Sequence, residues 1–230
     1  MEKDFSSLEK KLGISFHDRA VLQEACTHRS YLNENQQWPF PHNERLEFLG
    51  DAVLELAITE QLYKAYPKED EGKLTSVRAA LVNYITLAGV ARDISLGDYL
   101  LMSKGEAKDT GRAREVILAN AIEALLGALY LDQGYEITAQ FIKTHVFSLA
   151  QEIVEKELFK DAKSFFQERA QEKFKVTPSY QVLAQQGPDH RKEFVVGVFL
   201  SDKKIAEGKG FSKQEAEVEA AKRALESLED

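Results

Sequence analysis

The sequence of 230 residues has little cysteine, methionine or proline: one Cys, two Met and five Pro. A single thiol, Cys26, cannot form an intrachain disulfide, so we expect an intracellular protein held together by packing. The N-terminal residues contain no apolar stretch of signal-peptide length. The most apolar segment, Val116 to Leu131, is interrupted by Asn120 and Glu123 and falls short of a membrane span. We therefore expect a soluble cytoplasmic protein with no membrane partner.

The sequence also lacks an excess of basic residues: it has 30 Lys and Arg and 38 Asp and Glu, so its formal net charge is −8. Residues 161–230 are nearly balanced, with 12 Lys and Arg against 13 Asp and Glu. A negative chain argues against nonspecific coating of nucleic acid, but it leaves room for a local basic face. Cations of the C-terminal part lie at loop and helix-start positions: His190, Arg191, Lys192, Lys203, Lys204, Lys209 and Lys213. They form either a binding face or an ordinary solvated surface.

Apolar material is plentiful, with 43% hydrophobic and 10% aromatic residues, enough for one large or two small domains. Through residues 1–155, three- and four-residue apolar spacing predicts helices. Examples are Leu46, Leu49, Val53 and Leu56, followed by Leu81, Ile85, Leu87 and Val90. Loops are predicted where Gly, Pro, Asp and Thr gather, at residues 36–41, 67–72, 97–98 and 104–114.

The pattern changes near residue 160. A helix from Ala162 to Phe174 precedes three segments with strand chemistry, at residues 179–185, 193–201 and 203–209. Ser212 then opens a second helix with an alanine-rich face. We therefore predict a mainly α protein: a helical domain over residues 1–155, a junction at residues 152–161, and a small α-β-β-β-α domain over residues 161–230.

The most informative segment is HNERLEFLGDAVLE, residues 42–55. On a helix, its carboxylates Glu44, Glu47, Asp51 and Glu55 fall within about 80° of arc. The remaining residues are nearly all apolar, which predicts burial on most sides. Like charges at this spacing repel one another, and burial makes ionisation more costly. The acidic stripe therefore either faces water or holds a divalent cation.

A second segment, residues 116–128, favours the cation. Its only two polar side chains, Asn120 and Glu123, share one helical face. An unpaired Glu123 inside the fold would be destabilising, so a buried Arg45 or Arg78 is one candidate partner. The other interpretation is that Asn120 and Glu123 meet the acidic stripe and complete an oxygen cage suited to Mg²⁺ or Mn²⁺.

Residues 43–52, NERLEFLGDA, resemble the signature of bacterial ribonuclease III, the endonuclease of double-stranded RNA. Supporting segments follow the family's order: THRS at residues 27–30, DEG at residues 70–72, and residues 117–132. The C-terminal part resembles the double-stranded-RNA-binding domain of that family, so the resemblance covers essentially the whole chain. It implies an all-helical nuclease domain that works as a homodimer, each of two sites hydrolysing one strand of double-stranded RNA.

Several functional positions carry over from this resemblance. The implied metal ligands are Glu47, Asp51, Asn120 and Glu123, with Mg²⁺ as cofactor and Mn²⁺ as a substitute. The implied catalytic residues are Asp51 and Glu123, together with Glu44 and Glu71 at two further acidic positions. Phe48 falls at the family's dimer contact, although a core Phe is equally natural. His28 is interpreted as a core or capping residue.

The resemblance also implies three RNA contacts spread along one face of the second domain. The first helix would offer Ser164, Gln167 and Glu168 to a minor groove, and the loop at residues 187–190, with His190, would reach the next minor groove. Lys209, Ser212 and Lys213 would contact the phosphates between them. Such contacts read the shape of the duplex rather than its base sequence.

The chain departs from the family's pattern in two places. Position 120 is Asn where the family commonly has Asp, which removes one negative charge from the ligand set and weakens metal affinity. Lys213 is followed by Gln214 and Glu215 rather than further lysines, which predicts weaker and less salt-sensitive RNA binding. The leading hypothesis is an endoribonuclease that leaves 5′-phosphate and 3′-hydroxyl ends with two-nucleotide 3′ overhangs and processes rRNA and mRNA. The alternatives are a double-stranded-RNA-binding protein weakened in catalysis by Asn120, and a structural helical dimer with a solvated stripe.

Overall fold

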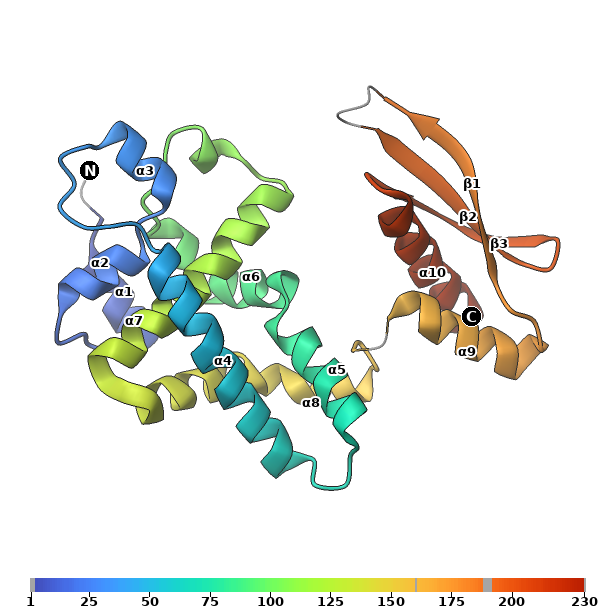
Figure 1. Cartoon of the computed structure of the whole chain (residues 1–230), viewed down its shortest axis with the longest axis horizontal. Helices are drawn as coiled ribbons and strands as arrows, with labels where there is room; N and C mark the ends of the chain where they lie inside the picture. The colour runs from blue at the N-terminus through green and yellow to red at the C-terminus, as the bar shows by residue number, and fades with distance from the viewer. Residues whose placement is uncertain (1–2, 160, 188–191, 230) are drawn as a thin grey trace. The chain divides into compact units, whose positions relative to one another are not determined.

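The structure, a computed structural model, describes residues 3–159, 161–187 and 192–229 (Figure 1). The chain divides into two compact units, Met1–Phe159 and Lys160–Asp230. The predicted fold class, mainly α with a C-terminal α-β-β-β-α part, is confirmed. The first unit contains α1 (Phe5–Leu12), α2 (Arg19–Ala25), α3 (Arg29–Glu34), α4 (Glu44–Ala65), α5 (Glu71–Val82), α6 (Tyr84–Asp93), α7 (Arg112–His145) and α8 (Ala150–Glu155), with short 3-10 turns η1 (Leu96–Asp98), η2 (Glu106–Lys108) and η3 (Phe147–Leu149).

The long helices α4 and α7 cross and carry the core of the first unit (Figure 1). Leu54 and Ile58 of α4, and Ile122 and Leu126 of α7, are fully buried. Burial of a leucine or isoleucine side chain of this kind contributes about 1.5–3 kcal/mol. The α7 segment that has only two polar side chains therefore lies in the centre of the first unit, because burial of its apolar residues stabilises the fold.

Two glycines let these helices meet backbone to backbone. A Cβ atom at Gly50 of α4 would lie 1.7 Å from the carbonyl oxygen of Glu123. A Cβ atom at Gly127 of α7 would lie 2.1 Å from the carbonyl oxygen of Leu46. Any larger residue would force the two helices apart, so Gly50 and Gly127 fix how closely α4 and α7 approach.

The apolar residues from Leu81 to Val90 are helical as predicted, but they belong to two helices, because Asn83 separates α5 from α6. The Asn83 side-chain oxygen accepts hydrogen bonds from the backbone N–H groups of Ile85 and Thr86, both at 3.0 Å. An Asn with extended backbone is a favourable N-cap, and this local preference overrode the continuous apolar spacing. Within the described residues, no single helix has the length and hydropathy of a membrane span; α5 and α6, bent by 47°, reach them only as a pair.

Two loop predictions extended into helices. Residues 67–72 overlap the first turn of α5, where the side chain of Asp70 accepts from the N–H of Lys73 at 2.8 Å and caps the helix. Residues 104–114 contain η2 and the start of α7 at Arg112. Asp and Gly occur both in loops and at helix starts, so composition alone did not separate the two.

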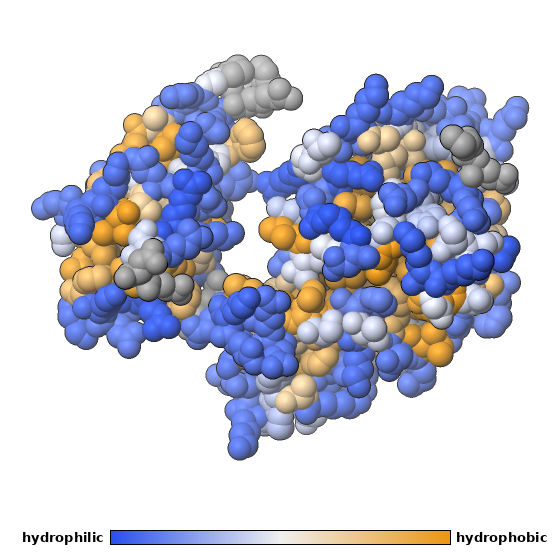
Figure 2. Space-filling model, turned by 180° about the vertical axis from the view of Figure 1, so that it is seen from behind, coloured by the Kyte–Doolittle hydropathy of each residue, from blue (hydrophilic) through white to orange (hydrophobic). Residues whose placement is uncertain are grey.

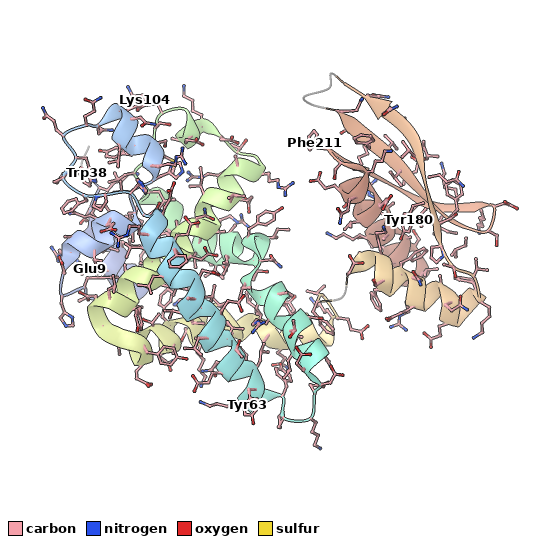
Figure 3. All side chains as sticks on the ribbon, in the orientation of Figure 1. Glu9, Trp38, Tyr63, Lys104, Tyr180 and Phe211 are labelled. Atoms are coloured by element: carbon pink, nitrogen blue, oxygen red, sulfur yellow. The ribbon has the colours of Figure 1, made fainter. Side chains whose placement is uncertain are left out.

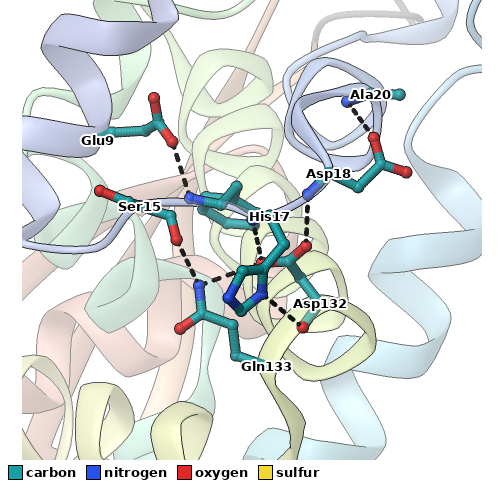
Figure 4. A network of polar contacts seen from close by, with 8 residues as sticks. Glu9, Ser15, His17, Asp18, Ala20, Asp132 and Gln133 are labelled. Atoms are coloured by element: carbon teal, nitrogen blue, oxygen red, sulfur yellow. Dashed lines mark hydrogen bonds and ion pairs between the residues drawn. The ribbon is translucent and has the colours of Figure 1, made fainter.

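A network of polar contacts fastens the N-terminal part of the first unit to α7 (Figure 4). The carboxylate of Asp132 accepts from the backbone N–H groups of His17 at 2.9 Å and Asp18 at 2.8 Å. Gln133 donates to the carbonyl oxygen of Ser15 at 2.8 Å. Burial alone would raise the pKa of Asp132, but these backbone donors hold it below its usual range. The network fixes the approach to α2 against the end of the long apolar stretch of α7.

The second unit packs two helices, α9 (Ala162–Phe174) and α10 (Lys213–Glu229), on a three-stranded sheet. The strands β1 (Ser179–Gln186), β2 (Glu193–Leu200) and β3 (Lys203–Gly210) are antiparallel in the order β1-β2-β3. The core includes Phe166, Val198, Ala220 and Ala224. A Cβ atom at Gly208 would lie 2.1 Å from the backbone nitrogen of Ala220, so α10 rests directly on β3. Figure 2 shows separate hydrophobic areas on each unit amid a mostly hydrophilic surface.

Candidate active site

The α4–α7 crossing brings the predicted ligand residues together. Glu47 and Asp51 lie on the α4 face that includes Gly50, and Asn120 and Glu123 lie on the α7 face that includes Gly127. The side chain of Asn120 hydrogen-bonds to the carboxylate of Glu47. Glu123 is close enough to Asp51 and Glu47 for their charges to act on it. We call these four residues, two from each helix, the acidic cluster.

Burial and like charge both disfavour ionisation of the glutamates in the acidic cluster. Burial raises the pKa of Glu123 to about 7, and the charges of Asp51 and Glu47 add to that effect. Burial and the charge of Glu44 also raise the pKa of Glu47, although the hydrogen bond from Asn120 opposes the shift. Between about pH 4.5 and pH 7, Glu123 therefore holds a proton that an unfolded chain would release.

The alternative ion pairs suggested by the sequence do not occur among the described residues. Arg78 pairs with Glu55, with 2.9 Å between its Nε and a carboxylate oxygen, and donates to the hydroxyl of Thr59 at 2.8 Å. The charge of Arg45 acts on Glu24. No cation of the described chain is a cause of the Glu123 shift. The described residues thus supply no cation to offset the like charges inside the acidic cluster. Within the stripe, Glu44 and Asp51 are exposed, whereas Glu47 is half-buried.

The donor set fits a hard divalent cation. Three carboxylates and one amide oxygen are the ligands that Mg²⁺ and Mn²⁺ prefer. Among the described residues, no three His, Cys, Asp or Glu side chains lie close enough together to coordinate a metal ion without side-chain movement. The carboxylates lie on facing helices within one another's electrostatic influence, and the cluster lacks the Cys and His ligands that zinc would favour.

Glu44 lies at the start of α4, where its own carboxylate meets two basic side chains. Arg29 Nη1 lies 3.4 Å from one Glu44 oxygen, and His42 Nδ1 lies 3.8 Å from the other. His28, interpreted as a core or capping residue, caps α3: its side chain accepts from the N–H of Ser30 at 3.3 Å. Glu44 therefore borders the acidic cluster and raises the pKa of Glu47 by its charge.

Glu71 is not brought to the acidic cluster within one chain. It begins α5 and lines a cavity of about 480 Å³ together with Leu62, Tyr63 and Leu74. Tyr63 follows Asp51 by 12 residues on α4, about 18 Å along the helix axis. The sequence motif identified an acidic residue at this position, but the direction of the chain after α4 places it at the other end of the unit.

The predicted burial of α4 on most sides was wrong. Phe48 is 82% exposed, Leu56 58% and Tyr63 75%. These side chains, with Ala52 and Thr59 between them, form one stripe at helical spacing that we call the apolar α4 stripe. Tyr63 marks its lower end in Figure 3. Phe48 is therefore not a core residue of the isolated chain.

In the second unit, the predicted RNA contacts lie on the surface wherever they are described. Ser164, Gln167 and Glu168 are exposed on α9. Lys209, the second-to-last residue of β3, and Lys213, the first residue of α10, are also exposed. Ser212 is half-buried and caps α10, since its hydroxyl accepts from the N–H of Glu215 at 3.1 Å. His190 lies outside the described residues.

Four residues that fix how the helices of the first unit pack were not predicted as functional from the sequence. Gly50 and Gly127 were visible as glycines inside helical patterns, which is a signal of close approach. Asp132 and Gln133 anchor the N-terminal segment to α7, and they were visible only as polar residues after an apolar run.

Together, the fold and site define a class: a helical domain with a carboxylate cluster between two crossing helices, joined to an α-β-β-β-α unit. The family model described as "Ribonuclease-III-like" matches residues 18–162, and the family model described as "Double-stranded RNA binding motif" matches residues 162–228. The chain belongs to the ribonuclease III family, whose members are endoribonucleases that generally depend on metal.

Similar proteins span nearly the full length. The chain is 44% identical to Ribonuclease 3 of Borreliella afzelii, over 98% of this chain and 91% of that protein. It is 45% identical to Ribonuclease 3 of Desulforamulus reducens, over 99% of this chain and 93% of that protein. A solved structure of the nuclease domain of ribonuclease III from Campylobacter jejuni is 38% identical to this chain and superimposes with a TM-score of 0.57. The match covers 63% of this chain and 97% of the Campylobacter chain. These matches support an endoribonuclease of double-stranded RNA.

Proposed function

We propose that this protein cleaves double-stranded RNA by metal-assisted phosphodiester hydrolysis. The observation that carries the proposal is the acidic cluster, in which two helices hold Glu47, Asp51 and Glu123 in mutual repulsion. The products would carry 5′-phosphate and 3′-hydroxyl ends with two-nucleotide 3′ overhangs. Structured ribosomal RNA precursors and messenger RNAs in the cytoplasm are the proposed substrates, since a shape-reading unit accepts duplexes of many sequences.

In this proposal, Glu47, Asp51 and Glu123 offer carboxylate oxygens to Mg²⁺ or Mn²⁺, and Asn120 offers its amide oxygen. The bound ions supply Lewis acidity and lower the pKa of water. Glu123 has to lose its proton to act as a ligand, so metal affinity is expected to rise with pH through about pH 7 and to level off above it. Gly50 and Gly127 keep the two pairs of donors at one fixed spacing.

Incubation of the purified protein with a duplex RNA, with and without Mg²⁺ or Mn²⁺, tests the function. Metal-dependent scission is expected. Binding without scission would instead favour the second candidate, a binding protein weakened by Asn120. If the protein neither binds nor cuts the duplex, the structural helical dimer is the remaining candidate.

Asn120→Asp tests the ligand role of Asn120. We expect about tenfold less metal to be needed for half-maximal cleavage, because ligand charge strengthens binding of a hard cation. In metal-free buffer the same variant should be less stable than the parent, because a fourth carboxylate replaces the amide that donates to Glu47. A metal titration of cleavage and a urea titration provide the two measurements. An unchanged metal requirement would contradict the assignment.

Lys213→Ala tests the phosphate contact at the start of α10. We expect weaker duplex binding and a log–log salt slope smaller by about 0.9, the contribution of one phosphate contact. Lys222→Ala is the matched control, since Lys222 is exposed further along the same helix. Fluorescence anisotropy of the full chain at several salt concentrations gives both quantities. Equal slopes for the Lys213 variant and the parent would overturn the contact.

We also propose that the apolar α4 stripe is the contact of a homodimer. Phe48 and Tyr63 lie at roughly equal distances on either side of Leu56, so a second copy can pair antiparallel about a two-fold axis near Leu56. Such pairing sets the Phe48 end of one copy against the cavity at the Tyr63 end of the other. Glu71, which lines that cavity, would then approach the acidic cluster of the other copy.

Leu56→Glu tests the dimer because it places two like charges at the proposed axis. We expect the parent to sediment as a dimer and the variant as a monomer with an unchanged helical circular dichroism spectrum. Ile85→Glu is the control, since Ile85 has the same 58% exposure but lies on α6. A variant that remains dimeric would exclude the stripe as the contact.

A further inference from the structure

Arg29 is an exposed side chain that contacts Glu44, the residue that borders the acidic cluster, and it has no role in the function proposed above. It is the first residue of α3, and its side chain is 70% exposed. Its Nη1 contacts Glu44, and its other guanidinium nitrogens make no hydrogen bond to the described residues. A guanidinium presents five donors in a planar fork, so most of its bonding capacity faces solvent.

The backbone around Arg29 is held in place by neighbouring contacts. His28 caps the helix immediately before it, and the hydroxyl of Ser30 accepts from the N–H of Ser103 at 3.0 Å. The N–H of Asn43 donates to the carbonyl oxygen of Thr27 at 2.9 Å, which ties the start of α4 to this segment. Arg29 therefore sits on a fixed platform next to Glu44 and does not depend on a loose loop.

The charge around the site makes a cation here useful. Residues 1–160 carry 18 Lys and Arg against 25 Asp and Glu, and the acidic cluster repels an RNA backbone before metal binds. An Arg fork pairs with phosphate oxygens by two parallel charge-assisted hydrogen bonds, which adds orientation as well as attraction. A phosphate on the free side of Arg29 would lie close to the cleavage site without displacing Glu44.

We propose that Arg29 binds a backbone phosphate of duplex RNA adjacent to the phosphate being cleaved, and so positions the strand over the acidic cluster. This inference rests on the proposed nuclease function and adds a substrate-binding residue to it. Arg29 anchors the strand, while Glu47, Asp51, Asn120 and Glu123 remain the metal-binding residues. Its contribution is to binding of the strand rather than to the chemical step.

The test compares Arg29→Gln and Arg29→Lys with the parent chain. For Arg29→Gln we expect KM for a duplex RNA to rise about five- to tenfold, with kcat at saturating RNA within about twofold of the parent. The salt slope of binding should shrink by about 0.9. Arg29→Lys should restore the slope but only part of the affinity, because an ammonium lacks the fork. Lys156→Gln removes one exposed charge of the same unit and should change neither KM nor slope.

Binding is measured separately on a Glu123→Gln background, in which the duplex is not consumed. This binding measurement tests Arg29 independently of cleavage. If the parent protein cuts no RNA, the proposed nuclease function is refuted, but the role of Arg29 in RNA binding is still tested. Unchanged affinity and slope in Arg29→Gln would overturn the inference. A fall in kcat with unchanged KM would also overturn it, because Arg29 would then act only by orienting Glu44.

Discussion

Glu123→Gln is expected to reduce cleavage of duplex RNA by on the order of 10³-fold at saturating Mg²⁺. The glutamine keeps the size of the side chain and removes the charge that α7 contributes to the acidic cluster. Duplex binding should remain, because the proposed phosphate contacts lie elsewhere. Single-turnover cleavage measures the rate. Glu136→Gln is the control, because Glu136 is exposed in the last part of α7, beyond the break in helical geometry at Gly134. A rate within tenfold of the parent would remove Glu123 from the site.

The same variant should be more stable than the parent in metal-free buffer near pH 8. The folded pKa of Glu123, about 7, exceeds its ordinary value of 4.5, so folding binds a proton between these values. Stability therefore falls as pH rises from about 4.5 to about 7 and stays low above it. Discounted for solvent access, the effect is about 1–2 kcal/mol. Urea titrations in EDTA at pH 5 and pH 8 should show this difference in the parent and not in Glu123→Gln; parallel behaviour would contradict the shift.

Gly50→Ala is expected to destabilise the chain by about 3 kcal/mol or more, the largest stability effect we predict. The added Cβ atom would stand 1.7 Å from the carbonyl oxygen of Glu123, and a backbone atom cannot swing aside. The helices must separate, which opens the core and moves Glu123 away from Glu47 and Asp51. Thermal and urea unfolding measure the loss of stability, and the metal requirement of any residual activity should rise.

Gly89→Ala is the matched control, because Gly89 also lies inside a helix of the same unit. Its added Cβ atom would meet nothing closer than Arg92 Nη2 at 3.8 Å. The change should be neutral or stabilising by up to about 1 kcal/mol, as alanine favours helix over glycine. Gly127→Ala should resemble Gly50→Ala. Equal stability of the Gly50 and Gly89 variants would show that α4 and α7 do not meet through backbone atoms.

The sequence was informative where a local pattern carries one physical meaning. Asn120 and Glu123 stand out because polar side chains within an apolar helix need partners, and the structure confirms that α7 is buried. The nearly continuous apolar run at residues 193–201 predicted β2 to within one residue. Each of these inferences needed only the helical or strand period and the cost of burying charge.

The sequence was less informative wherever two distant segments or a second molecule decide the outcome. Spacing showed that Phe48 is apolar, but it could not distinguish a side chain facing the core from one facing solvent, where it is 82% exposed. The position of Glu71 depends on where the chain turns after α4. The match of Gly50 with Gly127 depends on a helix crossing between residues 77 positions apart.

The three roles of α4 are interleaved along its sequence. Glu47, Phe48, Gly50 and Asp51 are near neighbours, yet they serve the acidic cluster, the apolar stripe and the helix crossing. One residue inserted among them would rotate everything downstream by about 100° and misdirect all three surfaces at once. In a library of single-residue insertions screened for cleavage, we expect no active variant with an insertion between Glu44 and Tyr63. Insertions in the loops on either side of α4 should preserve activity.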